Sequence, residues 1–108
     1  MKFSIFIKND PYHSQLPFAA LHFCETLLKK NHTLNCLFFY GDGIENLRAT
    51  NEIFNDWQAL AKTKTIDLLA CSLSTYARGL TITESTIQLA GLSTFMAHAT
   101  AADRILRF

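Results

Sequence analysis

Apolar residues of this chain gather in short runs, and amphipathic segments separate one run from the next. The runs at residues 3–7, 34–40 and 66–70 are rich in aromatic and branched side chains, and the second ends at the turn-forming sequence Gly41-Asp42-Gly43. Short apolar runs without regular polar alternation are typical of strands buried on both faces of a sheet. We therefore predict three central strands at these positions, and a further strand at residues 104–108.

Two longer segments have the periodicity of amphipathic helices. The first runs from Ser14, a residue type that caps helices, to about Asn31, and Pro17 is tolerated because it lies in the first turn. Its expected apolar face consists of Leu16, Ala20, Phe23, Cys24 and Leu27. The second helix begins at Thr50 or Asn51. Its single apolar stripe, which should face the core, consists of Ile53, Phe54, Trp57, Leu60 and Ala61.

The elements in the last third of the chain are shorter. Residues 72–78 predict a short helix, and Gly79 suits its C-terminal end. Residues 80–85 form a connection of undefined shape. Residues 86–89 fit either a short strand or part of a helix, and the pattern does not separate the two. An alanine-rich helix is expected at residues 93–101.

This alternation of strands and helices defines the expected architecture. Strands that are buried on both faces and separated by helices form a parallel sheet with helices on either side. The sequence contains no linker, internal repeat or low-complexity segment, and 108 residues suffice for one hydrophobic core but not for two. We therefore predict a single α/β domain over residues 1–108, a Rossmann-like three-layer sandwich with a mostly parallel sheet of about five strands.

Composition and charge exclude several functional classes. Hydrophobic residues make up 49% of the chain and charged residues 18%, which argues against a disordered protein. The ten basic residues are scattered among nine acidic ones, so direct nucleic-acid binding by this chain alone is not expected. The longest apolar runs fall far short of the roughly 20 residues that a membrane span needs, and no signal-peptide cleavage site follows the first run. We expect a cytoplasmic protein.

The three cysteines, Cys24, Cys36 and Cys71, indicate neither a disulfide framework nor a metal centre. A reducing cytosol disfavours structural disulfides, and an odd number of cysteines without a C-x-x-C motif does not match a zinc site. The four histidines contain no metal-ligand pair such as H-x-x-x-H. The sequence therefore predicts that the protein binds no metal.

Reactive groups of an open parallel sheet gather where the strands end. In this chain those ends carry residues 9–13, residues 40–43 and the pair Cys71-Ser72. Cys71 is expected between a strand and a helix, where the helix dipole and unpaired backbone N–H groups favour the thiolate. A buried cysteine that acts only as a small apolar residue is about equally common, so position alone leaves both interpretations open.

The other candidate residues have weaker support. Cys24 falls on the apolar face of the first helix and Cys36 inside a strand, so both are expected in the core. His13 is the one histidine expected at the reactive edge, where it could assist Cys71, although a solvated turn histidine is the more ordinary interpretation.

Glycine and serine motifs indicate no other catalytic class. The sequence Gly41-Asp42-Gly43 does not continue into G-x-G-x-x-G, which argues against a dinucleotide site. No P-loop and no G-x-S-x-G nucleophile elbow is present, so Ser72 and Ser74 are interpreted as helix-start residues.

Several short motifs follow one another in an order that resembles a known family. They are Met1-Lys2-Phe3-Ser4-Ile5, the Pro11-Tyr12 turn, Phe38-Phe39-Tyr40 with Gly43, Cys71 followed by Arg78-Gly79, and Asp103-Arg104 with Phe108. Together they resemble the DsrE-type sulfur carriers nearly end to end, and within that family the TusD-like subunits of the bacterial sulfur relay. The resemblance implies that Cys71 matches the cysteine that accepts sulfur as a persulfide.

The resemblance also implies partners for that chemistry. TusD-like subunits form a heterohexamer with TusB-like and TusC-like subunits, accept sulfur from a TusA-like donor and pass it to a TusE-like acceptor, toward 2-thiolation of the tRNA wobble uridine. Related DsrE proteins carry sulfur in the opposite direction, in sulfur oxidation. The expected activity is thus a sulfurtransferase that acts through Cys71, with no metal or organic cofactor and no contact with nucleic acid or membrane.

This chain differs from the family pattern at two places that affect which partners it is expected to bind. The segment between Gly79 and Gly91 is shorter than in TusD-like chains, and the helix after Cys71 carries Ser72-Leu73-Ser74-Thr75-Tyr76 where the family has small apolar residues. Two other interpretations stay open: a non-catalytic assembly subunit with a buried Cys71, and a homo-oligomeric DsrE-like protein that binds a small ligand at the strand ends. The exposure of Cys71 and the composition of the oligomer distinguish them.

Overall fold

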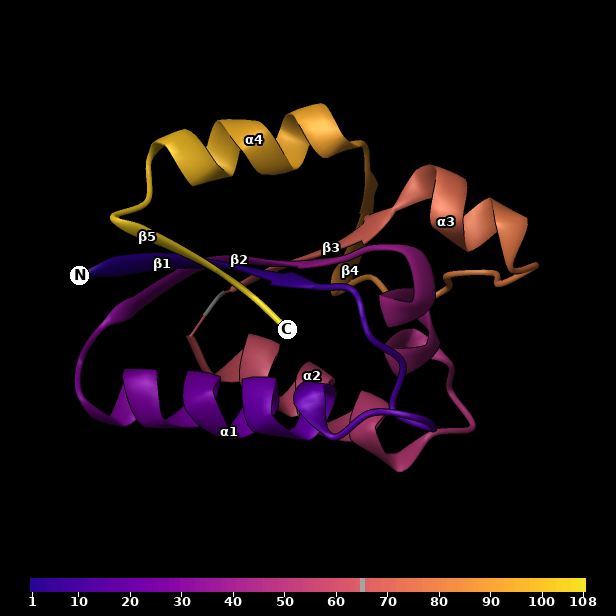
Figure 1. Ribbon diagram of the computed structural model, residues 1–108, viewed down its shortest axis with the longest axis horizontal. Coiled ribbons are helices and arrows are strands. Elements are labelled where there is room, and N and C mark those ends of the chain that lie inside the picture. The colour runs from indigo at the N-terminus through magenta and orange to yellow at the C-terminus, as the bar shows by residue number, and fades with distance from the viewer. Residues whose placement is uncertain (65) are drawn as a thin grey trace.

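Five parallel strands form one sheet in the computed structural model, which describes residues 1–64 and 66–108 (Figure 1). The strands are β1 (Lys2–Ile7), β2 (Thr33–Phe39), β3 (Asp67–Cys71), β4 (Ile87–Ala90) and β5 (Arg104–Arg107). They lie in the order β4-β3-β2-β1-β5, and every neighbouring pair is parallel. The expected α/β architecture is confirmed. The segment predicted at residues 86–89 as either strand or helix is the strand β4, shifted by one residue to Ile87–Ala90.

Helices cover both faces of the sheet. The helices α1 (Leu16–Lys29) and α2 (Glu52–Lys64) lie together on one face, whereas α4 (Leu92–Thr100) lies alone on the other (Figure 1). A short helix, α3 (Ser72–Ala77), follows β3 directly, and a 3-10 helix, η1 (Gly41–Leu47), follows β2. Within the described residues, no helix is both long and apolar enough to cross a membrane.

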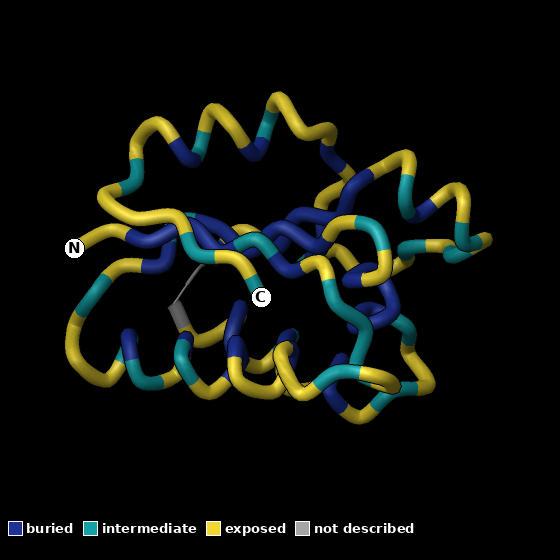
Figure 2. Tube along the Cα trace, viewed as in Figure 1, coloured by how far each residue is buried: buried dark blue, intermediate teal, exposed yellow. Residues whose placement is uncertain are grey.

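The continuous apolar runs arise because each central strand is covered on both sides. Alternate side chains of a strand point to opposite faces, so Leu37 and Leu68 join the core beneath α1 and α2, whereas Phe38 and Leu69 join a second cluster beneath α4. Figure 2 shows the buried residues concentrated along the sheet, with the outer turns of the helices exposed. The first core is the larger one, and the fully buried Trp57 of α2 belongs to it.

The apolar face of α1 is rotated from the one that the sequence predicted. Leu16 is exposed and Phe23 is only partly buried, while Pro17 and Leu21 take the inward positions beside the correctly predicted residues. Those correctly predicted inward residues are Ala20, Cys24 and Leu27. The observed face follows the regular spacing of an amphipathic helix, and Phe23 packs at its margin, edge-on against Phe3.

The ends of α1 also differ slightly from the prediction. Gln15, not Ser14, flanks the first helical turn, although the Ser14 Oγ accepts a hydrogen bond from the Leu16 N–H at 3.0 Å. The helix ends at Lys29, and Asn31 adopts a left-handed backbone conformation with φ of 65° as the chain turns toward β2.

The turn sequence Gly41-Asp42-Gly43 that follows β2 is the start of the 3-10 helix η1, and the central residues of η1 are buried. Ile44 and Leu47 belong to the larger core, so the segment is seated on the sheet. Gly43 lies against the end of β1: a Cβ added to it would overlap the carbonyl group of Ile7, whose carbon atom would be 2.8 Å away. Only glycine allows η1 to approach the strand this closely.

Candidate functional site

Cys71 lies at the junction between β3 and α3, as the sequence predicted. It is the last residue of the strand, pairs with Ala90 of β4, and flanks the first turn of α3 with φ of −59° and ψ of 121°. The strands are parallel, so this position is at the carboxyl edge of the sheet, together with the ends of β1 and β2.

The Cys71 side chain belongs to the apolar cluster beneath α4. Its neighbours in that cluster include Phe38, Leu69, Ala90 and Phe95, and Cys71 itself is 5% exposed. Little of the thiol meets solvent in this arrangement. The remaining exposed surface of Cys71 lies at the strand ends, where β3 continues into α3.

The helix that follows Cys71 is mostly exposed. Leu73 is 81% exposed and Tyr76 is 87% exposed, and Thr75 is the buried residue of α3. The hydroxyl groups of the two serines bond to neighbouring segments instead of capping the helix. Ser72 Oγ donates to the Ala90 carbonyl oxygen at 3.3 Å, and Ser74 Oγ accepts from the Gly41 N–H at 2.9 Å.

A network of charged residues, which the sequence pattern does not indicate, joins η1 to the C-terminal end of α3. At its centre is Glu45, which is 8% exposed. Arg48 donates from Nε to Glu45 Oε1 at 2.7 Å and from Nη2 to Oε2 at 3.0 Å. Arg78 donates from Nη1 to Glu45 Oε2 at 3.1 Å, and its Nη2 pairs with the carboxylate of Asp42. We name these four residues the Glu45 network.

Hydrogen bonds to Glu45 keep its carboxyl group ionised. The bonds from Arg48 are the main cause, and together with Arg78 they outweigh burial and lower the pKa of Glu45 to about 2. Tyr12 also donates its hydroxyl to Glu45 Oε1 at 3.3 Å. The Glu45 network thus connects η1, the turn before α2 and the end of α3, and the Tyr12 hydroxyl links it to the turn after β1.

The other two thiols are in the core, as predicted. Burial is the main cause that raises the pKa of Cys24 to about 12 and that of Cys36 to about 11. Both side chains are fully buried, and none of the three cysteines forms a disulfide. At neutral pH these two groups are protonated thiols, which are poor nucleophiles.

The histidines do not converge on Cys71. His13 is exposed, and its Nδ1 lies 3.2 Å from Asp10 Oδ1 within its own turn. His98 on α4 has its Nε2 3.2 Å from Asp67 Oδ2, at the beginning of β3. Among the residues that the structure describes, no group of three or more His, Cys, Asp or Glu side chains is placed to hold a metal ion. The role of His13 as an assistant to Cys71 stays a prediction.

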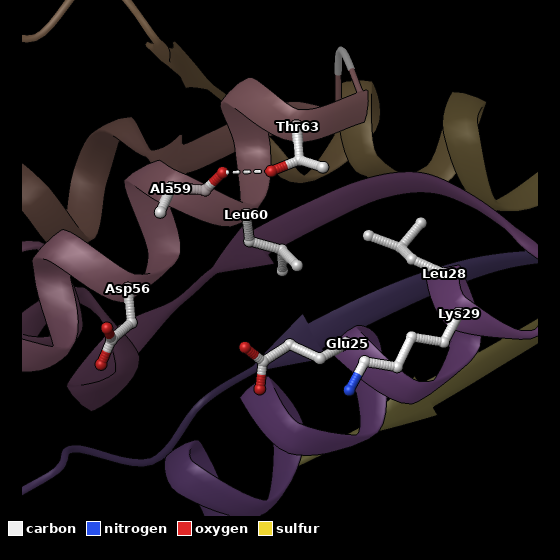
Figure 3. A pocket seen from close by; sticks show the side chains of 7 residues that line it. All are labelled: Glu25, Leu28, Lys29, Asp56, Ala59, Leu60 and Thr63. Atoms are coloured by element: carbon white, nitrogen blue, oxygen red, sulfur yellow. Dashed lines mark hydrogen bonds between the residues drawn. The ribbon is translucent and has the colours of Figure 1, made fainter.

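A groove of about 360 Å³ lies between α1 and α2, on the face of the sheet opposite the Cys71 cluster (Figure 3). Leu28 and Leu60 point toward each other across it, and Glu25 and Asp56 lie at its rim. Its lining contains no residue of the strand ends, so this groove is separate from the candidate site.

Comparison with known proteins identifies relatives over the whole length of the chain. The model of the DsrE/DsrF-like family matches residues 1–108. The chain is 30% identical to a protein named sulfurtransferase TusD from Buchnera aphidicola, over 128 aligned positions that cover all of both chains. It is 29% identical to a putative sulfurtransferase DsrE from Allochromatium vinosum, covering all of this chain and 98% of that one.

Both alignments run over more positions than this chain has residues, so the relatives carry segments that it lacks. That the missing segment lies between Gly79 and Gly91 stays a prediction. Among solved structures, the ychN protein from E. coli superposes with a TM-score of 0.84 at 20% identity, covering 100% of this chain and 99% of that one. This likeness shows a shared fold.

Proposed function

This chain belongs to the DsrE/DsrF-like family, and from that premise we propose that it is a sulfur relay protein that carries sulfur as a persulfide on Cys71. The observation that carries the proposal is the position of Cys71, at the carboxyl edge of the sheet and directly before a helix. Relatives across the full length are named sulfurtransferases, which supports sulfur transfer as the activity.

The chemistry consists of two thiol exchanges. In the first, the Cys71 thiolate attacks the outer sulfur of a donor persulfide, R–S–SH. A sulfur–sulfur bond to Cys71 forms, the bond within the donor breaks, and the donor leaves as the thiolate R–S⁻. In the second, an acceptor thiolate attacks the outer sulfur of Cys71–S–SH and releases the Cys71 thiolate. No net oxidation occurs, because the transferred sulfur keeps its oxidation state.

The surroundings of Cys71 suit a carrier of a labile sulfur atom. Cys24 and Cys36, with raised pKa values, do not compete for the donor at neutral pH. Burial of Cys71 among Phe38, Phe95 and their neighbours excludes water and oxidants from a bound persulfide. The exposed helix α3 offers a partner protein a surface directly beside the thiol, because Leu73 and Tyr76 face solvent.

The partners follow from the proposed place in a sulfur relay. TusB-like and TusC-like subunits would complete a heterohexamer, with a TusA-like donor and a TusE-like acceptor, toward 2-thiolation of tRNA wobble uridine in the cytoplasm. The exposed apolar side chains of α3 and α4 support association: Leu73, Tyr76, Leu92 and Met96. Sulfur oxidation is the alternative direction of flow, since a relative is named DsrE.

One observation favours a second candidate function. Cys71 is 5% exposed, which fits a non-catalytic assembly subunit whose cysteine is only part of the core. Mass spectrometry of the intact protein after incubation with a persulfide donor separates the two functions. We expect a mass gain of one sulfur atom that maps to the peptide containing Cys71 and that a reducing agent removes. A protein that gains no sulfur would be the assembly subunit.

A further inference from the structure

The helix that begins directly after Cys71 has almost no apolar anchor of its own. Its two large apolar side chains, Leu73 and Tyr76, point into solvent, and its one buried side chain is Thr75. Its contacts are mainly with η1 and with β3, the strand from which it continues. Apolar burial therefore does not fix the orientation of α3, and polar bonds have to do so.

Two polar ties connect α3 to η1. In the middle of α3, the Ser74 hydroxyl accepts a hydrogen bond from the Gly41 N–H at 2.9 Å. At its C-terminal end, the Arg78 guanidinium spans two carboxylates, with Nη1 on Glu45 at 3.1 Å and Nη2 on Asp42. The Arg78 carbonyl oxygen also accepts a hydrogen bond from Arg48 Nη2 at 3.3 Å.

The residues that hold Arg78 are themselves fixed to the sheet. Glu45 is buried and keeps its two bonds to Arg48 independently of Arg78. The segment η1 that carries Glu45 is held against the end of β1 by the close approach of Gly43 to Ile7. Arg78 therefore connects an element with little apolar packing to one that is buried against the sheet. A planar guanidinium fits this task because it binds two carboxylates in a defined geometry.

We propose that Arg78 is a positioning residue for Cys71: by tying the end of α3 to η1, its guanidinium fixes the helix whose flanking residue carries the reactive thiol. Arg78 does not touch the sulfur atom; it acts through the backbone of α3. The proposal rests on the proposed function only in taking Cys71 as the reactive thiol. In sulfur transfer between bound partners, a misplacement of the reacting group by about 1 Å can cost about a hundred-fold in rate.

The rate at which iodoacetamide alkylates Cys71 tests this proposal without any sulfur donor. Cys24 and Cys36 have raised pKa values, so brief labelling near neutral pH reports on Cys71. We expect Arg78→Met to slow labelling several-fold, because the end of α3 then no longer holds the Cys71 backbone in place at the strand end. Amide hydrogen exchange should become faster in residues 72–79 and stay unchanged in β1, β2 and β3. The matched control is Arg107→Met, which removes an exposed guanidinium from the edge strand β5 and should change neither quantity.

Two further variants separate positioning from general stability. Arg78→Lys keeps the charge but lacks the fork that spans Asp42 and Glu45, so we expect a labelling rate between those of Arg78→Met and the wild type. Asp42→Asn removes the ion pair between Arg78 and the exposed Asp42, and it leaves the ion pair between Arg48 and Glu45 intact. It should slow labelling in the same direction, and it decides the question if Arg78→Met does not fold. In the double variant the two effects should be less than additive.

The proposal is overturned if Arg78→Met, or Asp42→Asn in its place, labels Cys71 at the wild-type rate. Faster labelling in these variants would overturn it as well, because α3 would then be a cover that hides the thiol. Failure of the proposed function has a different signature: a wild-type Cys71 that iodoacetamide alkylates but that takes no sulfur from a persulfide donor. The alkylation rates of the variants still decide the role of Arg78 in that case.

Discussion

Cys71 contributes a buried side chain to the fold and a sulfur atom to the proposed chemistry, and a serine at this position affects both. Replacement by serine places a hydroxyl group in the apolar cluster with Phe38 and Phe95, so we expect the free energy of unfolding to fall by about 1–3 kcal/mol. The same variant should gain no sulfur from a persulfide donor, because a hydroxyl cannot hold a second sulfur atom. Urea denaturation and intact-mass spectrometry measure the two effects.

Alanine at position 71 provides the control for burial. Cys71→Ala introduces no polar group, so it should be more stable than Cys71→Ser and equally unable to take up sulfur. Cys24→Ala should retain the sulfur adduct, since that thiol lies in the opposite core. Sulfur uptake at the wild-type rate by either variant of Cys71 would show that another cysteine is the carrier.

Glu45 makes the stability of the protein depend on pH in the acidic range. The bonds from Arg48 and Arg78 lower the pKa of the Glu45 carboxyl from 4.5 to about 2 in the folded state. A lowered pKa stabilises the folded state above the unfolded-state value, and this stabilisation is lost as the pH falls from about 4.5 toward 2. We expect Glu45→Gln to lower the free energy of unfolding at pH 7 by about 1–3 kcal/mol, because the neutral amide loses the charged hydrogen bonds to Arg48 and Arg78. Solvent screening limits the loss, because both arginines are partly exposed.

Chemical denaturation at several pH values checks this origin of the stability. The difference between the wild type and Glu45→Gln should be largest above pH 5 and should shrink as the pH approaches 2. A difference that is constant over this range would mean that the substitution acts through packing and not through the charge of Glu45.

At the residue scale, the sequence predicted Cys71 but not the Glu45 network. The position of Cys71 follows from chain order, since a residue between a strand and a helix must lie at the edge of a parallel sheet. Glu45 and Arg78 are 33 positions apart, and single charges between apolar runs have the pattern of solvated surface residues. Their pairing depends on where η1 and α3 meet, and local pattern does not contain that information.

Among the elements, η1 packs closely against the end of β1 because residue 43 is a glycine. Gly43→Ala would bring a methyl group into the Ile7 carbonyl, which belongs to the backbone and cannot rotate away, so we expect a loss of about 2–4 kcal/mol. Gly91→Ala is the matched control, because its methyl group would meet nothing closer than Ser93 Oγ at 3.9 Å. The control should cost no more than about 1 kcal/mol, the usual effect at a helix N-cap. Equal midpoints of thermal unfolding in the two variants would contradict this account.

The sequence predicts those elements whose burial requires a recognisable pattern of apolar residues. Strands covered on both faces require continuous apolar runs, and the three central runs match β1, β2 and β3 closely. The 3-10 helix η1 has no such signal, because its seven residues include two glycines, two acids and an asparagine. The face of α1 was misassigned because Leu16 and Phe23 are as apolar as the residues that do point inward, and only packing against the sheet distinguishes them.

At the scale of the whole molecule, the two faces of the sheet are covered unequally. Two long helices lie on one face, whereas the nine residues of α4 lie alone on the other (Figure 1). Exposed apolar side chains occur on α4 and also on α3. Soluble proteins commonly cover exposed apolar side chains of this kind by association. We expect a stable oligomer well above the 12.2 kDa of one chain, measured by light scattering at micromolar concentration.

Native purification with candidate partner chains distinguishes the forms of association. Two different partner chains in the same particle would support the proposed heterohexamer, whereas a particle of this chain alone would support the homo-oligomer. A clean monomer that captures neither would contradict both.

The strand order has a consequence for folding while the chain is being synthesised on the ribosome. The edge strand β5 pairs with β1, so that Phe3 lies beside Arg104, and Lys8 donates its N–H to the Phe108 carbonyl oxygen. The β1 strand leaves the exit tunnel before β5 and cannot satisfy its outer edge until residues 104–107 have also emerged. While the residues between these two strands are synthesised, β1 therefore presents an open, aromatic-rich edge, which is the kind of surface that nascent-chain chaperones bind.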